Sequence, residues 1–234
     1  MASGPPGAMA DMNMPGMAET LAPALRPWDP GAVAYMFSMW AVMMAGMMTP
    51  SVAPMVLLYA AVGRRAADGD APFAQTGWFF AGYLAVWITF SALATGAQWG
   101  LTSLALLTPM MAASSHRLGG GLLIAAGLYQ LTPVKDICLS NCRSPLGFLM
   151  ARGGFRREPA GAFRLGMSHG VFCLGCCWAL MALLFVGGVM NVLWIAGLSI
   201  LILLEKIAPA GRLLSRISGA LLAAAGLWLL LRGV

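Results

Sequence analysis

Several stretches of this chain are apolar for about twenty residues, the length that an α-helix needs to cross the hydrocarbon core of a membrane. The apolar residues in them are continuous rather than alternating, which favours helices over strands. The chain of 234 residues is 60% hydrophobic and only 9% charged, so it has too few charged side chains to cover a soluble domain. The sequence therefore predicts an all-α, multi-pass membrane protein.

We expect six transmembrane helices in one helical bundle. Their predicted ranges are 33–62, 77–99, 110–132, 165–187, 190–206 and 214–232. The third is the least regular, because it begins next to Pro109 and the segment 101–114 can alternatively form a short interfacial helix. Residues 1–32 are predicted to be a methionine-rich flexible tail, and 33–234 a single transmembrane domain with a cysteine-containing cytoplasmic loop around 133–164.

The basic residues predict how the chain is oriented. Eleven of the 14 Lys and Arg residues follow the first, third and fifth predicted helices, and therefore lie on one side. Basic residues in short loops are retained in the cytoplasm, so both termini are predicted to be extracytoplasmic. The net charge of +6 then indicates the lipid bilayer as a partner, through its anionic inner leaflet, and needs no nucleic acid.

Two segments of the chain resemble each other. The sequences GGGLLIAAGLYQL (119–131) and SGALLAAAGLWLL (218–230) agree at eight of thirteen positions. They fall in the third and sixth predicted helices, which run in opposite directions. This pattern is expected of an inverted three-plus-three repeat, although Gly, Ala and Leu matches also arise by chance in membrane helices.

One histidine and three cysteines share a face of the fourth predicted helix. They lie at positions i, i+4, i+7 and i+8: His169, Cys173, Cys176 and Cys177. At about 100° per residue they occupy an arc of roughly 100°, and convergent ligands need such a shared face. An ionisable side chain inside a span is also a candidate functional residue. Simple packing is the alternative, because a reduced cysteine behaves as a small hydrophobic residue.

A second pair of cysteines, Cys138 and Cys142, lies in the predicted loop with a Cys-x3-Cys spacing. On a helical turn the two side chains would face the same way. Thiols in the cytoplasm stay reduced, and the total of five cysteines is odd, so complete disulfide pairing is disfavoured. A transient disulfide is left open by this argument.

Methionine is the third unusual feature, with 18 residues in the chain. A stripe on the first predicted helix spans an arc of roughly 80° and consists of Met36, Met39, Met43 and Met47. We predict Met39 and Met43 as metal ligands, although a methionine stripe is also typical of core packing. The tail adds four more, Met9, Met12, Met14 and Met17, which resemble a copper-capturing arm or form a polar tail without function.

These donors indicate which metal the chain would bind. Thiolates, thioethers and imidazole select soft ions, with Cu(I) ahead of Zn(II) or an iron–sulfur cluster. Glu205 is the only acidic residue within a predicted helix, and either an ion pair with the adjacent Lys206 or snorkelling toward the membrane surface would account for it. The sequence has neither a phosphate-binding loop nor a recognisable paired-carboxylate or serine–histidine–acid set. It therefore favours metal binding over enzymatic activity.

Three stretches resemble the domain of unknown function 2182 family. They are WAVMMAGMMTP (40–50), YQLTPVKDICLSNCRSPLGFL (129–149), and HGVFCLGCCWALMALLFVGGVMNVLW (169–194), which is followed by Glu205-Lys206. Members of that family are bacterial integral-membrane proteins described as predicted metal-binding. The resemblance covers roughly residues 33–230 and implies a helical fold in the bacterial inner membrane. It also implies a metal site, carried here by Cys138, Cys142, His169, Cys173, Cys176 and Cys177.

The function predicted from the sequence is that of a membrane protein that binds Cu(I) as a carrier, a chaperone or an assembly factor. Its expected partner is a membrane or extracytoplasmic metalloprotein. One alternative is a thiol–disulfide oxidoreductase in which Cys138 and Cys142 exchange electrons with Cys173 and Cys176. Another is an accessory subunit of a larger membrane complex, whose thiols only fill helix interfaces.

Overall fold

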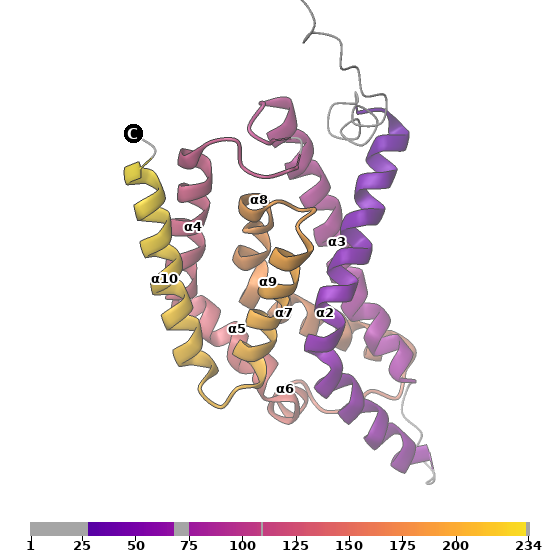
Figure 1. Ribbon diagram of the computed structural model, residues 1–234. Helices are drawn as coiled ribbons and strands as arrows, with labels where there is room; N and C mark the ends of the chain where they lie inside the picture. The colour runs from indigo at the N-terminus through magenta and orange to yellow at the C-terminus, as the bar shows by residue number, and fades with distance from the viewer. Residues whose placement is uncertain (1–27, 68–74, 109, 233–234) are drawn as a thin grey trace, which may run out of the picture.

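The computed structural model describes residues 28–67, 75–108 and 110–232, and within these ranges the chain is all-helical without a β-strand (Figure 1). The helices are α2 (Pro30–Ala67), α3 (Thr76–Ser103), α4 (His116–Gln130), α5 (Pro133–Arg143), α6 (Pro145–Ala151), α7 (Pro159–Ala182), α8 (Leu184–Gly187), α9 (Val192–Ile207) and α10 (Gly211–Arg232). The predicted all-α fold is confirmed. The methionines of the predicted tail lie outside the described residues.

Four helical segments are long and apolar enough to cross a membrane: Pro30–Arg64, Thr76–Ser103, Pro159–Gly187 and Gly211–Arg232. A fifth is obtained if α4 and α5, which are bent by 65° against each other, form one span. Helix α9 has only 16 residues. At about 1.5 Å per residue, it is shorter than the roughly 30 Å of the hydrocarbon core. The described helices therefore supply four or five candidate spans, and the predicted count of six is not confirmed.

The third predicted helix, 110–132, is shorter than expected and is followed by a bend. Helix α4 begins only at His116. The chain turns before Pro133, whose ring has no N–H and cannot continue the helix. Thr132 then caps α5 by accepting a hydrogen bond from the Lys135 backbone N–H. The predicted cysteine-containing loop consequently begins with two helices, α5 and α6.

Helices α3 and α7 cross with almost no space between their backbones. A Cβ atom on Gly82 would lie 2.0 Å from the carbonyl oxygen of Phe163, and one on Gly166 would lie 1.9 Å from that of Phe79. Only glycine fits such an approach, as is typical of tight crossings between membrane helices. The crossing fixes which face of α7 is turned toward α3.

Helices α4 and α10 lie side by side at one edge of the bundle (Figure 1). Their contact is reciprocal: a Cβ atom on Gly120 would lie 2.9 Å from the oxygen of Gly226, and one on Gly127 would lie 2.6 Å from that of Gly219. These four glycines occupy matching positions in the two similar segments of the sequence. Two related helices packed antiparallel would interlock in this way, but the inverted repeat itself stays a prediction.

A buried polar network holds the bend between α4 and α5. The Lys135 ammonium donates to Glu205 at 2.6 Å, and their side chains are 0% and 2% exposed. Gln130 donates to the second carboxylate oxygen of Glu205 at 2.8 Å and to Ser218 at 2.9 Å. The predicted ion pair between Glu205 and its neighbour Lys206 was wrong, because Glu205 pairs with Lys135. Both lysines are buried, so two of the basic residues counted for the orientation are not free loop charges.

We expect Gly82→Ala to lower the thermal unfolding temperature in detergent, because its methyl group would lie 2.0 Å from the Phe163 carbonyl oxygen. Overpacking of this kind costs about 1–3 kcal/mol. The matched control is Gly96→Ala in the same helix, where no atom lies within 4 Å of the added carbon. The control should be neutral or gain up to about 1 kcal/mol, because alanine has the higher helix propensity. Equal unfolding temperatures would contradict the close crossing.

Lys135→Met is expected to destabilise the fold by about 3–5 kcal/mol, because it leaves the buried Glu205 carboxylate without its counter-charge. Adding Glu205→Gln to the same chain should restore part of this loss, since the amide needs no cation. Chemical unfolding of the purified protein in detergent measures both effects. A single variant as stable as the double variant would show that the ion pair does not hold the bend.

Candidate metal centre

The histidine and cysteines of α7 point into the bundle, as their shared helix face predicted. All four side chains are buried: His169, Cys173, Cys176 and Cys177. The thiols of Cys176 and Cys177 each donate to the carbonyl oxygen of Cys173 at 3.0 Å. This places three sulfur atoms around one turn of α7, on the side that faces the interior.

Helix α5 brings Cys142 to this turn. Its Sγ atom lies 4.0 Å from that of Cys176. Cys138, one turn earlier, is half-buried and packs on the α7 backbone, where a Cβ atom on Gly175 would lie 2.7 Å from its sulfur. The five cysteines are free thiols. The two cysteines of the Cys-x3-Cys pair therefore take different positions, and Cys142 is the one that meets a thiol of α7.

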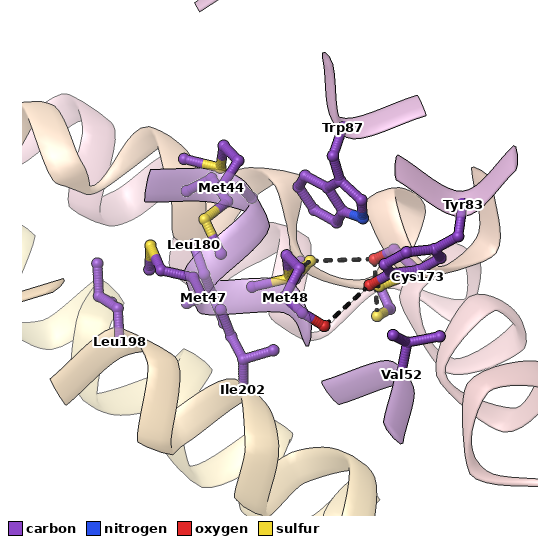
Figure 2. Packing of buried hydrophobic residues seen from close by; sticks show 14 of the residues in the cluster. Met44, Met47, Met48, Val52, Tyr83, Trp87, Cys173, Leu180, Leu198 and Ile202 are labelled. Atoms are coloured by element: carbon purple, nitrogen blue, oxygen red, sulfur yellow. Dashed lines mark hydrogen bonds between the residues drawn. The ribbon is translucent and has the colours of Figure 1, made fainter. Parts of the chain in front are cut away.

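Helix α2 contributes a methionine that was not predicted as a ligand. The Cys177 sulfur lies 4.0 Å from the Met48 sulfur, and Met48 is fully buried. Figure 2 shows Met48 next to Tyr83 and Cys173, with Met44 and Met47 farther along α2. Met36, Met44 and Met48 are spaced by multiples of four residues in the sequence, and this spacing could have predicted that they lie on the buried face of α2.

The predicted ligands Met39 and Met43 lie beside this buried face. Both side chains are half-buried and pack against the core. Met43 lines an apolar groove between α2 and α9, together with Ile195 and Ser199. Metal binding by Met39 and Met43 stays a prediction.

A buried lysine reaches the sulfur atoms from α9. Lys206 is 8% exposed, and its ammonium donates to the Cys173 sulfur at 2.9 Å and to the Ser51 hydroxyl. The Tyr83 hydroxyl lies 3.1 Å from the same sulfur and 3.2 Å from the Met48 carbonyl oxygen. A buried ammonium needs an anionic partner, which a thiolate at Cys173 provides. Sequence reasoning missed this role because Lys206 stands at the end of a predicted span.

His169 lies in a box of aromatic rings. Its ring centroid is 4.9 Å from that of Phe148 and 6.0 Å from those of Phe79 and Tyr83. The side chain is 3% exposed, and its Nδ1 atom has no hydrogen-bond partner among the described residues. A buried polar atom without a partner is costly, so this nitrogen is suited to bind a further group.

Sulfur dominates the chemistry of this cluster, which we call the thiol cluster: Cys142, Cys173, Cys176, Cys177 and Met48. Such donors match soft cations. A metal–thiolate bond is about 2.3 Å for zinc, so one ion can bridge two sulfurs separated by 4.0 Å, as Cys142 and Cys176 are. Within the described part of the chain, no three His, Cys, Asp or Glu side chains stand together as a ready-made metal site. A third ligand would have to be a thioether or a side chain that rotates.

Comparison with known families identifies the metal. A family model described as "PpoB2: Copper chaperone" matches residues 37–229, which include every described candidate ligand except Met36. The domain of unknown function 2182 is not confirmed by that name. No curated protein sequence and no solved structure matches. The family points to copper as the bound metal, in agreement with the soft donors of the thiol cluster. This chain belongs to the PpoB2 family of copper chaperones.

Proposed function

We propose that this protein is a membrane-embedded chaperone that binds Cu(I) at the thiol cluster and passes it to a metalloprotein. The observation that carries the proposal is the meeting of sulfur atoms from three helices. Cys142 of α5 lies 4.0 Å from Cys176 of α7, and Met48 of α2 lies 4.0 Å from Cys177. Met48 and Cys177 are 129 residues apart in the sequence. Packing alone does not require sulfur on both sides of each of these two contacts.

The donor types favour Cu(I) over other ions. Zn(II) and hard cations bind more readily where imidazole or carboxylate joins the site. Glu205, the one buried carboxylate among the described residues, is engaged by Lys135 at 2.6 Å and by Gln130 at 2.8 Å. The neutral thioether of Met48 suits Cu(I) and is a poor ligand for zinc. His169, with its free Nδ1 atom, is a further candidate ligand on the same helix.

Charge compensation supports a cationic cargo. Burying a charge in an apolar interior is costly unless other charges compensate it. Thiolates formed at the cysteines of the thiol cluster would compensate the charge of a bound Cu(I) ion as well as that of Lys206, whose ammonium contacts the Cys173 sulfur.

The proposed location is the bacterial inner membrane, with the bilayer around a single domain from residue 33 to 234. The apolar lengths of the four or five candidate spans support it. The six-span topology, the inverted repeat and the extracytoplasmic termini belong to this proposal. Residues 1–32 would then be a methionine-rich tail on the outside, where a metalloprotein partner could receive copper.

The incomplete ligand set supports transfer rather than storage. A structural metal site encloses its ion with a full set of ligands. Here two thiols already stand at a bridging distance, and within the described residues no three His, Cys, Asp or Glu side chains are arranged to enclose an ion. A partner that offers more ligands can therefore take the ion by ligand exchange.

Thiol–disulfide exchange is the second candidate function, and the same 4.0 Å contact favours it. A disulfide needs a sulfur–sulfur bond of about 2.05 Å, which a small side-chain rotation could reach from here. Exchange also requires an accessible thiolate. Cys176 is buried, so an external thiol would have to attack Cys142. This candidate is therefore weaker than copper binding.

Cys142→Ser and Cys176→Ser are each expected to weaken Cu(I) binding by at least about tenfold, equal to 1.4 kcal/mol. Both remove a sulfur from the closest thiol pair. Cys138→Ser should have a smaller effect, because that sulfur packs on the α7 backbone at Gly175. Competition with a chromogenic Cu(I) chelator, performed without oxygen on the purified protein, gives the affinities. Unchanged affinity in all three variants would remove the thiol cluster from the proposal.

Mild oxidation of the protein, with and without bound copper, distinguishes the two candidate functions. If the chain is a chaperone, bound Cu(I) should block a Cys142–Cys176 disulfide, because both sulfurs are then ligands. Mass spectrometry of peptides after thiol alkylation detects that linkage. A disulfide that forms equally fast with and without copper, and that exchanges with added dithiols, would favour the oxidoreductase instead.

A further inference from the structure

The described residues 104–108 and 110–115 between α3 and α4 lie at the end of the bundle opposite to α5 and α6 (Figure 1). They form a segment that is folded back on itself by a bridge between Leu107 and Ala113. The backbone N–H of Ala113 donates to the Phe185 carbonyl oxygen at 2.6 Å, and this bond ties the segment to α8. The segment is therefore fixed in place over the interior.

Met111 is held in this segment with an unusual backbone. Its φ angle is 55°, in the left-handed region that residues other than glycine rarely adopt. The backbone N–H donates to the Thr108 carbonyl oxygen at 2.8 Å. The side chain is 4% exposed and points away from the surface. An uncommon backbone conformation that places a thioether inside the protein is grounds for a functional hypothesis.

The Met111 sulfur shares a hydrogen-bond donor with Met36 of α2. The Nε2 atom of Gln98, on α3, lies 3.0 Å from the Met111 sulfur and 3.5 Å from the Met36 sulfur. The Trp40 indole N–H donates to the Gln98 Oε1 atom at 2.6 Å and so fixes which side of the amide faces the sulfurs. Lone pairs of two thioethers therefore converge on one electropositive group. All four side chains are buried.

We propose that Met36 and Met111 form a second Cu(I) site, at which the chaperone first captures its ion. We call it the thioether site. The Gln98 amide holds the two sulfurs together and is displaced when Cu(I) binds, because the soft ion is the better partner for thioether lone pairs. This inference rests on the proposed copper-chaperone function and adds the position at which the ion is first bound.

The buried face of α2 connects the thioether site to the thiol cluster. Met36 precedes Met48 by twelve residues, which is about 18 Å along the helix. Met44 lies between them and is fully buried. The side chains of Met44 and Met48 project from the same part of α2 (Figure 2). Flexible thioethers spaced along one helix face offer successive ligands along this path.

The direction of transfer follows from charge. Copper remains Cu(I) throughout, and each step replaces one copper–sulfur bond by another without moving an electron or a proton between thioethers. Thioethers are neutral, so they leave the positive charge of the ion uncompensated in an apolar interior. In the thiol cluster, a thiol that binds Cu(I) would release its proton to water, and the resulting thiolate would compensate the charge. Cu(I) therefore binds more weakly at the thioether site than at the thiol cluster, as a capture site requires.

The test measures Cu(I) binding by the purified full chain in detergent, without oxygen, against a chromogenic Cu(I) chelator. Met111→Leu and Met36→Leu are the variants, and Met55→Leu is the matched control because Met55 is also buried on α2. Methionine-to-leucine changes conserve volume and cost less than about 1.5 kcal/mol. Thermal unfolding confirms that each variant is folded.

We expect Met111→Leu and Met36→Leu each to lose at least about tenfold in affinity for the weaker Cu(I) ion. The tighter ion and the control should not change. Binding by Met111→Leu and Met36→Leu identical to that of Met55→Leu would overturn the thioether site. Cys142→Ser with Cys176→Ser tests the proposed function separately: loss of only the tighter ion supports both sites. If that double variant binds Cu(I) like the unaltered chain, copper binding at the thiol cluster is refuted. The methionine variants then still test copper binding at the thioether site.

Discussion

The backbone contact between α3 and α7 is the constraint on which the candidate copper site depends. Two glycines allow these helices to approach until a Cβ atom would lie about 2 Å from the opposing carbonyl oxygen. The crossing turns His169 and Cys173 toward Tyr83, whose hydroxyl lies 3.1 Å from the Cys173 sulfur. Helices α2, α5 and α9 then pack around this pair and bring their sulfur and nitrogen atoms to one turn of α7.

Buried charge provides the second constraint, and it is concentrated at the end of α9. Glu205 and Lys206 are adjacent, so their side chains leave the helix about 100° apart and meet different neighbours. Glu205 binds Lys135 at the α4–α5 bend, and Lys206 binds the Cys173 sulfur. Each charge finds a partner because an unpaired one would cost several kcal/mol in this interior. The short helix α9 thus contacts both the α4–α5 bend, which positions Cys142, and the thiols of α7.

Buried sulfur atoms lie on α2 and at the contact between α5 and α7. Neutral thioethers lie along the buried face of α2, and thiols lie where α5 and α7 meet. A carrier of a monovalent soft ion benefits from both kinds of ligand, because weaker ligands hand the ion to stronger ones without any change of oxidation state. Membership of the copper chaperone family agrees with this chemistry.

The sequence by itself determined the helical class, four of the apolar spans, the stripe of His169 and Cys173–Cys177, and a soft metal, because periodicity and donor type are local properties. It did not determine that Cys142 rather than Cys138 meets Cys176, that Met48 reaches Cys177, or that Lys206 binds Cys173 while Glu205 pairs with Lys135. Helix periodicity shows which residues share a face. Which face meets which neighbour is decided by the glycine crossings and the bend before Pro133, and these exist only in the packed structure.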